Sequence, residues 1–315
     1  MSAISRRGFL ASAALSPLGV GLTGANASAQ TPAPLRRLGG TRLKTSLNAY
    51  SFNKALNDQM KGRGQGVSLF DLIHFCAEQN IDALDPTGYF FPGYPNVPSD
   101  KYLNDFRRSA FLNGVEISGT GVRNNFASPD RAKRAADVQH VKEWVECASR
   151  MGAPVLRVFA GAEPTGHSWD EVASWMVDDL KTCVEHAEKH GVLIGIQNHG
   201  DMLKSADQVL EIVKRVDSEW FGVIVDTGYF LTANPYQDIA RVIPHAVNWQ
   251  IKEKVGSKDG PAKIDMKRLV KIIRESHYRG YLPIETLSAP GESYEPRSRV
   301  TALLVLLRQA LKETE

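Results

Sequence analysis

Cysteine is scarce in this chain, which has only three among 315 residues. Cys76, Cys147 and Cys183 are odd in number and lie in apolar patterns typical of helices, where a free thiol behaves as a small core hydrophobe. A disulfide framework, the usual support of small exported domains, is therefore not expected. The fold must depend on a hydrophobic core instead.

An excess of charge of one sign is also missing. The formal net charge is +3, and Arg6 and Arg7 are the only charged residues before residue 30, which leaves +1 for the remainder. Nucleic-acid binding through counterion release requires a strongly basic surface, so we expect no nucleic-acid partner. No later apolar run reaches the length of a membrane span, so we expect no membrane association once the N-terminal segment is removed.

The N-terminal segment has the features of an export signal. Residues 5–10 read SRRGFL, a weakly apolar run follows from Ala11 to Leu22, and residues 27–29 read ASA, the small-x-small pattern of a cleavage site. Paired arginines directly before Gly-Phe-Leu predict a twin-arginine signal. We therefore expect residues 1–29 to be a signal peptide, residues 30–42 to be a lead-in segment, and the protein to be periplasmic or secreted.

The rest of the chain alternates short β-rich apolar runs with amphipathic stretches. Strands are predicted at 43–52, 81–88, 115–120, 155–160, 192–198, 221–226, 247–252 and 282–286. Helices are predicted near 68–80, 99–113, 130–151, 169–190, 205–216, 235–245, 265–277 and 293–313. Eight strand–helix units favour an α/β fold, a single-domain (β/α)8 TIM barrel over residues 43–315. The alternative, a doubly wound open sheet, usually has a glycine-rich turn after its first strand, and none is found here.

Functional residues of such a barrel lie at the carboxyl ends of its strands. The last four predicted strands each end an apolar run with an oxygen-bearing side chain, namely Gln197, Asp226, Gln250 and Glu285. Buried carboxylates are costly unless they are paired or bound to a metal. The pattern predicts a site for one divalent metal ion, and the oxygen ligands favour Mn²⁺ or Mg²⁺ over Zn²⁺.

The same strand ends carry a resemblance. The segments 196–199 (IQNH), 225–228 (VDTG), 250–252 (QIK) and 284–286 (IET) resemble, in order, the motifs of strands five to eight in the xylose-isomerase-like barrels of the sugar phosphate isomerase/epimerase family. The resemblance implies a metal-dependent enzyme whose two glutamates move a proton at the carbon beside a sugar carbonyl. That family usually has Glu, Asp, His and Glu at the metal positions.

Two of the four positions depart from the family pattern. Asp226 and Glu285 match its metal ligands, whereas Gln197 and Gln250 stand where it has Glu and His. An amide oxygen can still bind a hard cation, although the site then has one anion fewer. The resemblance therefore implies a metal site of reduced charge.

The loss of one glutamate also changes the expected acid–base chemistry. Gln197 has no titratable group, so the two-glutamate shuttle is incomplete. His199 lies two residues further along the same strand face, and its intrinsic pKa near about 6.5 makes it the predicted base. Lys252 and Glu253 are second choices, and Lys252 is better suited to hold a substrate oxygen or to stabilise an enolate. Glu285 can combine metal binding with acid–base work.

Four further residues are candidate substrate contacts: Tyr50, Asp85, Arg123 and Arg157. Arg157 is a charge inside an apolar strand, which indicates either an anionic or hydroxyl-rich ligand at the mouth or a buried carboxylate partner. Aromatic residues such as Tyr50 suit stacking against a sugar face, but they serve as often in packing.

The site residues also have structural interpretations. Asp226 precedes Thr-Gly and could be a turn residue, and Glu285 could pair with Arg157 or Lys252. His199 could be a hydrogen-bonded loop residue, and Gln250 could merely satisfy backbone groups inside the barrel.

Three functions remain open from the sequence. The first, which we predict, is an isomerase or epimerase acting on a small non-phosphorylated carbohydrate, since sugar phosphates are confined to the cytosol. The second is a lyase or hydrolase that cleaves a 3-keto-glycoside by β-elimination. The third is a catalytically silent barrel that only binds sugar. A multi-zinc nuclease is disfavoured by the balanced charge, and a homo-oligomer is compatible with the sequence.

Overall fold

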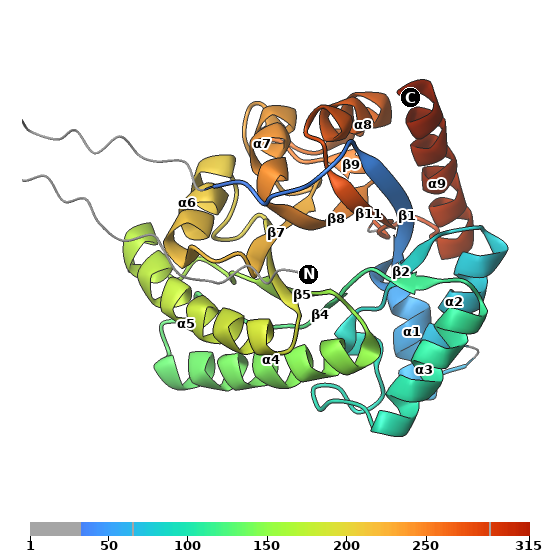
Figure 1. The fold of residues 1–315 in the computed structure, drawn as a ribbon, viewed down its shortest axis with the longest axis horizontal. Helices are drawn as coiled ribbons and strands as arrows, with labels where there is room; N and C mark the ends of the chain where they lie inside the picture. The colour runs from blue at the N-terminus through green and yellow to red at the C-terminus, as the bar shows by residue number, and fades with distance from the viewer. Residues whose placement is uncertain (1–32, 65, 290) are drawn as a thin grey trace, which may run out of the picture. The chain divides into compact units, whose positions relative to one another are not determined.

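A parallel β-sheet curls into a ring, and helices cover its outside (Figure 1). The structure, a computed structural model, describes residues 33–64, 66–289 and 291–315. The predicted signal peptide lies outside the described residues. Within the part that is described, no helix is long and apolar enough to cross a membrane.

The strands of the ring agree closely with the predicted ones. They are β1 (Arg42–Asn48), β2 (Ala83–Asp85), β3 (Glu116–Ile117), β4 (Thr120–Gly121), β5 (Val155–Phe159), β6 (Leu193–Gln197), β7 (Phe221–Asp226), β8 (Ala246–Lys252) and β11 (Arg279–Glu285). Their order in the sheet is β3-β2-β1-β11-β8-β7-β6-β5-β4, and every neighbouring pair is parallel. This arrangement confirms the predicted barrel.

The third predicted strand is broken into β3 and β4. β3 pairs with β2, and β4 pairs with β5. A parallel bridge between Thr87, two residues after β2, and Gly121 of β4 closes the ring. Gly119 lies at the break. A Cβ at this position would lie 2.8 Å from Asn248 Nδ2 and 3.0 Å from Asp85 Oδ2, so only glycine lets the chain pass these side chains.

Helices follow the strands at nearly all of the predicted positions. They are α1 (Asn53–Met60), α2 (Leu69–Glu78), α3 (Asp100–Leu112), α4 (Arg131–Met151), α5 (Trp169–Lys189), α6 (Ala206–Val216), α7 (Pro235–Val242), α8 (Met266–Glu275) and α9 (Pro296–Glu313). Ser168 caps α5 by accepting a hydrogen bond from the backbone N–H of Glu171, as its sequence indicates. Gly152 ends α4 at φ +80°, in the left-handed region that favours glycine. Gly280 follows the predicted helix 265–277 and lies inside β11.

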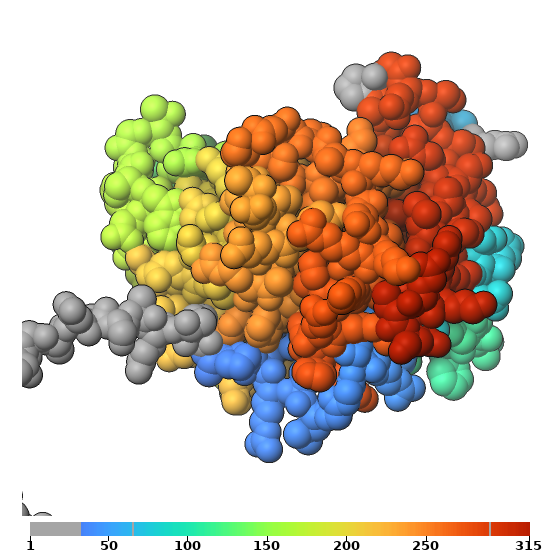
Figure 2. Space-filling view, turned by 90° about the horizontal axis from the view of Figure 1, so that it is seen from above, coloured from blue at the N-terminus to red at the C-terminus, as the bar shows by residue number. Residues whose placement is uncertain are grey.

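The apolar faces of the helices pack on the outside of the sheet and form the core. Trp144 and Trp249 are completely buried there, and burial of each such side chain contributes on the order of 2–3 kcal/mol. The three cysteines are free thiols and are also buried. In Figure 2, α7, α8 and α9 lie side by side on the face formed by the C-terminal part of the chain, orange to red.

Two local features were not predicted, and both flank the mouth of the barrel. β1 ends at Asn48 rather than residue 52 because the Asn48 side chain accepts from the backbone N–H of Tyr50 and starts a short 3-10 helix. That helix leads into α1, which the sequence pattern does not predict. After β8, the short strands β9 (Lys254–Val255) and β10 (Ala262–Lys263) form an antiparallel pair.

Candidate active site

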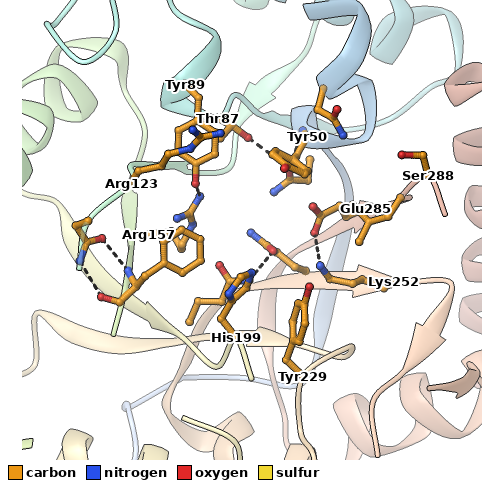
Figure 3. A pocket seen from close by; sticks show the side chains of 17 residues that line it. Tyr50, Thr87, Tyr89, Arg123, Arg157, His199, Tyr229, Lys252, Glu285 and Ser288 are labelled. Atoms are coloured by element: carbon orange, nitrogen blue, oxygen red, sulfur yellow. Dashed lines mark hydrogen bonds and ion pairs between the residues drawn. The ribbon is translucent and has the colours of Figure 1, made fainter. Parts of the chain in front are cut away.

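A cavity of about 610 Å³ opens where the strands of the barrel end (Figure 3). Eight of the eleven candidate residues line it, and Asp85, Asp226 and Glu253 do not. The lining residues are Asn48, Tyr50, Asn53, Thr87, Tyr89, Arg123, Asn124, Arg157, Phe159, Gln197, His199, Tyr229, Gln250, Lys252, Glu285, Leu287 and Ser288. Residues from almost every strand end meet here, as expected for a barrel of this class.

On one side of the cavity the side chain of Lys252 reaches between two carboxylates. Its Nζ atom lies 3.2 Å from Asp226 Oδ2 and 3.0 Å from Glu285 Oε2. Asp226 is completely buried behind the lysine, while Lys252 and Glu285 line the cavity. Burial disfavours the charge of Lys252, but the two carboxylates outweigh this effect and raise the pKa of Lys252 above its usual value. The lysine is therefore an ammonium at neutral pH.

Amide groups complete the polar network around this ion pair. The Gln197 Nε2 atom donates to Asp226 Oδ2 at 2.6 Å and to Gln250 Oε1 at 2.8 Å. The Gln250 amide also fits in the reverse orientation, in which its nitrogen donates to Glu285 Oε2 at 3.0 Å and its oxygen accepts from Asn48 Nδ2 at 3.3 Å. The Gln197 Oε1 atom is buried without a partner among the described residues. That oxygen can accept a hydrogen bond from a hydroxyl group of a ligand.

The donor set does not fit a divalent metal ion as it stands. Both carboxylates hold the Lys252 ammonium, and an amide N–H rather than an oxygen of Gln197 faces Asp226. A divalent ion among the same oxygens would lie close to the ammonium. At about 4 Å and an effective dielectric constant of about 20, their repulsion is about 8 kcal/mol. Metal binding at these residues would require the lysine to move away or to lose its proton.

A second group with metal-binding side chains lies on the outside of the barrel. Glu146 of α4 and His186 and His190, at the end of α5, have ligand atoms within 4.8 Å of one another. This group lies near the C-terminal end of α5 and contains none of the predicted ligands. The sequence reading did not identify it.

The His199 ring lies between two aromatic side chains, which the sequence did not predict. Its ring packs against those of Phe159 and Tyr229, with centroids 4.7 Å and 4.5 Å away. Burial, followed by the charges of Lys252 and Arg157, lowers the pKa of His199 to about 4. The imidazole is therefore neutral at neutral pH and carries a lone pair that can accept a proton, although the low pKa makes it a weak base.

On the opposite side of the cavity Arg157 is buried without a counter-charge. Its Nη1 atom donates to the Val122 carbonyl at 2.7 Å, its Nη2 atom donates to the Tyr89 hydroxyl, and its guanidinium lies 4.0 Å from the centroid of the Phe159 ring. No carboxylate within the described ranges forms an ion pair with it, which removes the alternative of a buried carboxylate partner. Arg123 is exposed, and its guanidinium carbon lies over the Tyr89 ring, 4.5 Å from the ring centroid.

Three predicted residues take different positions from those expected. Asp85 lies under the cavity floor, where Asn248 Nδ2 donates to it at 3.0 Å, and burial raises the pKa of Asp85 to about 7. It was expected at the mouth as a substrate contact, but its side chain points into the barrel. Asp226 supports Lys252 from behind and also forms a turn, since the backbone N–H of Gly228 donates to its Oδ1 at 2.8 Å. Glu253 pairs with Arg299 at 2.7 Å, outside the cavity lining.

Several lining residues escaped the sequence reading: Asn48, Asn53, Thr87, Tyr229, Leu287 and Ser288. Two of them have a signal in the sequence. Asn48 is the polar end of an apolar run, and Tyr229 directly follows the Asp-Thr-Gly segment. Asn53 begins α1, and Thr87, Leu287 and Ser288 lie in loops whose course no periodicity predicts.

Fold and cavity together define a (β/α)8 barrel with a polar site at its carboxyl end. The chain belongs to the family of xylose isomerase-like TIM barrels, whose pattern matches residues 73–307. It is 27% identical over 241 residues to an uncharacterized protein of Methanocaldococcus jannaschii, a match that covers 69% of this chain and 79% of that protein.

Two proteins with described activities are also similar. The C-glycoside deglycosidase alpha subunit of Arthrobacter globiformis is 24% identical over 147 residues, which cover 44% of this chain and 36% of that subunit. The crystal structure of a 3-keto-D-glucoside 4-epimerase from E. coli superimposes with a TM-score of 0.66 at 13% identity and covers 85% of this chain and 99% of that one. At that identity the superposition establishes the fold alone.

Proposed function

We propose that this protein is an enzyme of the sugar isomerase/epimerase type, which removes a proton from the carbon beside a carbonyl of a non-phosphorylated carbohydrate. The observation that carries the proposal is the pairing, in one cavity, of a neutral imidazole with an ammonium. His199 can accept a proton, and Lys252 can stabilise negative charge on an oxygen. Aromatic and arginine side chains around them suit a hydroxyl-rich ligand.

The reaction follows from these two groups. The substrate carbonyl oxygen accepts a hydrogen bond from Lys252, and His199 takes the proton of the neighbouring C–H bond. The electron pair of that bond forms a C=C bond, and the carbonyl electron pair moves to the oxygen, which becomes an enolate. Return of the proton to the other face inverts the carbon, and its delivery to the former carbonyl carbon gives the isomer. Glu285, 3.0 Å from Lys252, is suited to move protons between the oxygens.

A second reaction starts from the same enolate. If the carbon next to the enolate bears a glycosidic oxygen, the electron pair can expel it, so that a 3-keto-glycoside is cleaved by β-elimination. Two observations favour this alternative: Gln197 leaves the site without the second base that inversion uses, and the chain resembles a C-glycoside deglycosidase subunit over part of its length. A silent sugar-binding barrel remains the alternative without chemistry.

Hydrogen exchange tests the common first step of both reactions. Free ketoses and 3-keto-glucosides are incubated with the protein in D₂O, and deuterium uptake at carbon is followed by NMR. We expect uptake with at least one compound, and its loss by about 100-fold or more in His199→Ala. His74→Ala, at an exposed helix position, is the matched control. Unchanged exchange in His199→Ala would exclude the imidazole as the base, and binding without any exchange would indicate the silent barrel.

Three expectations from the sequence remain predictions. Export rests on the twin-arginine motif, so a reporter fused to residues 1–35 should be exported and should lose export in the Arg6→Lys/Arg7→Lys variant. The sequence predicts one Mn²⁺ or Mg²⁺ per chain, whereas the position of Lys252 between the two carboxylates favours a site without metal, and elemental analysis of the purified protein decides between them. Sedimentation of the purified protein decides whether it is a homo-oligomer.

A further inference from the structure

We propose that the ammonium of Lys252 occupies the position a divalent cation would take between Asp226 and Glu285, and acts in its place as the positive group at the substrate carbonyl. The first part concerns the site alone. The second part rests on the proposed function, since it assigns Lys252 a role in that reaction. The site is then independent of divalent metal.

The contacts of Lys252 are those of a bound cation. Its Nζ atom is within 3.2 Å of Asp226 and 3.0 Å of Glu285, and it lies 4.8 Å from the centroid of the Tyr229 ring. An ammonium has three N–H donors, and the two carboxylates use two of them. The third is left for a ligand in the cavity that Lys252 lines.

The surrounding backbone makes room for the lysine stem. A Cβ on Gly228 would lie 2.9 Å from Lys252 Cδ, so the absence of a side chain there opens the path of the stem. The neighbouring Thr227 hydroxyl accepts from the backbone N–H of Lys252 at 2.9 Å and fixes the strand end. The same loop therefore orients both Asp226, through the Gly228 N–H, and the lysine that Asp226 binds.

The site has one anion fewer than the family pattern implies for a metal site. Gln197 and Gln250 are neutral, so Asp226 and Glu285 are the two anions that face Lys252. Gln197 turns an N–H group, rather than its oxygen, toward Asp226. With a glutamate and an imidazole at these two positions, the set would carry one more negative charge and one more metal-binding nitrogen.

The ammonium can perform the chemical step without a metal. When the C–H proton leaves, negative charge develops on the carbonyl oxygen, and Lys252 either keeps a charge-assisted hydrogen bond to it or donates its proton, which gives an enediol and a neutral amine. In the second case the proton returns to the amine as the carbonyl re-forms, so the electron and proton count is balanced without a further reactant.

A metal titration tests the proposal without any substrate. Binding of Mn²⁺ is followed by the EPR signal of the free ion in the wild-type chain, in Lys252→Ala, and in the triple variant Gln197→Glu/Gln250→His/Lys252→Ala. We expect no stoichiometric binding to the wild type at submillimolar Mn²⁺. The triple variant should bind one ion per chain, roughly 100-fold more tightly or better, and its melting temperature should rise with added Mn²⁺. Lys258→Ala, which changes an exposed lysine, should behave as the wild type.

The wild-type protein alone can overturn the proposal. One Mn²⁺ bound per wild-type chain, or deuterium exchange that EDTA abolishes and Mn²⁺ restores, would show that a metal is used despite Lys252. This holds even if the variants fail to fold. If no substrate shows exchange, the proposed function fails, but the Mn²⁺ titration still decides whether the lysine fills the cation position.

Discussion

Each side of the cavity has one buried, positively charged side chain, and the two side chains differ in the groups that surround them. The lysine side consists of Lys252 and Glu285, and the arginine side consists of Arg157, Arg123 and Tyr89 (Figure 3). Asp226, buried behind Lys252, belongs to the lysine side but does not line the cavity. Lys252 and Arg157 are similarly buried, with 8% and 6% of their surfaces exposed. Only the lysine has carboxylate partners among the residues that the structure describes.

The charge of Lys252 is balanced by carboxylates of the protein, whereas the charge of Arg157 is available to a ligand. Lys252 is neutralised within the protein, so its ion pairs hold the strand ends together and fix its position. Arg157 is held by a carbonyl, a hydroxyl and aromatic rings, and its Nε atom is buried without a partner. A hydroxyl-rich or anionic group of a substrate can therefore gain more from Arg157 than from the lysine side.

The largest expected effect comes from breaking the lysine side. Lys252→Met leaves Asp226 and Glu285 buried without a cation, and removing one partner of a buried ion pair costs about 3–5 kcal/mol. The free energy of unfolding, measured by urea titration near neutral pH, should fall by this amount. Lys258→Met, at an exposed position, should change it by less than about 0.5 kcal/mol. A loss below about 1 kcal/mol in Lys252→Met would mean that the two sides do not differ in this way.

On the arginine side we expect a smaller loss of stability but a larger loss of ligand affinity. Arg157→Met removes two hydrogen bonds but leaves no carboxylate unpaired, so we expect the free energy of unfolding to fall by only about 1–2 kcal/mol. The affinity for a bound sugar should fall about 10- to 100-fold, which corresponds to the loss of a charged hydrogen bond. Calorimetric titration with a ligand found by exchange or binding measures this change.

Arg123→Met is the matched variant on the same side. Arg123 is exposed and covers the Tyr89 ring, so its loss should weaken binding less than the loss of Arg157. A strongly destabilised Arg157→Met protein with unchanged affinity would contradict the assignment of the arginine side to the ligand.

Much of this site can be predicted from the sequence, because the alternation of a strand states which side chains face the barrel axis. Alternation puts Gln197 and His199 on the same face of one strand, and Gln250 and Lys252 on the same face of another strand. All four residues line the cavity. The barrel itself follows from eight repeated strand–helix units.

The sequence does not predict how deep a side chain lies in the barrel or which side chains it contacts. Strand alternation predicts that the Asp85 side chain faces the inside of the barrel, but it does not predict how far below the mouth the carboxyl group lies. That depth is set by the hydrogen bond from the Asn248 amide and by the space that Gly119 leaves. Lys252 and Asp226 were assigned separate roles, since nothing in the local pattern reveals that the stem of the lysine passes Gly228 to reach that carboxylate. Such contacts join residues from different strands, so only the assembled barrel determines them.

The smallest expected effect concerns the carboxyl group beneath the cavity. Burial raises the pKa of Asp85 from 3.8 to about 7, so between these values the folded chain holds a proton that the unfolded chain has lost. The contribution of Asp85 to stability therefore decreases as the pH rises from about 4 to about 7. His199 acts in the opposite direction, because its lowered pKa, about 4 against 6.5, makes stability rise over much of the same range.

Asp85→Asn isolates the first of these two contributions. The asparagine keeps an acceptor for Asn248 and no longer titrates, so its stability relative to the wild type should increase with pH, by about 1 kcal/mol between about pH 5 and about pH 6. Urea unfolding of both proteins across this range measures the difference, from which His199 cancels. A difference that does not change with pH would mean that Asp85 is ionised throughout. In that case its negative charge would reach Arg157, and the arginine side would have a counter-charge after all.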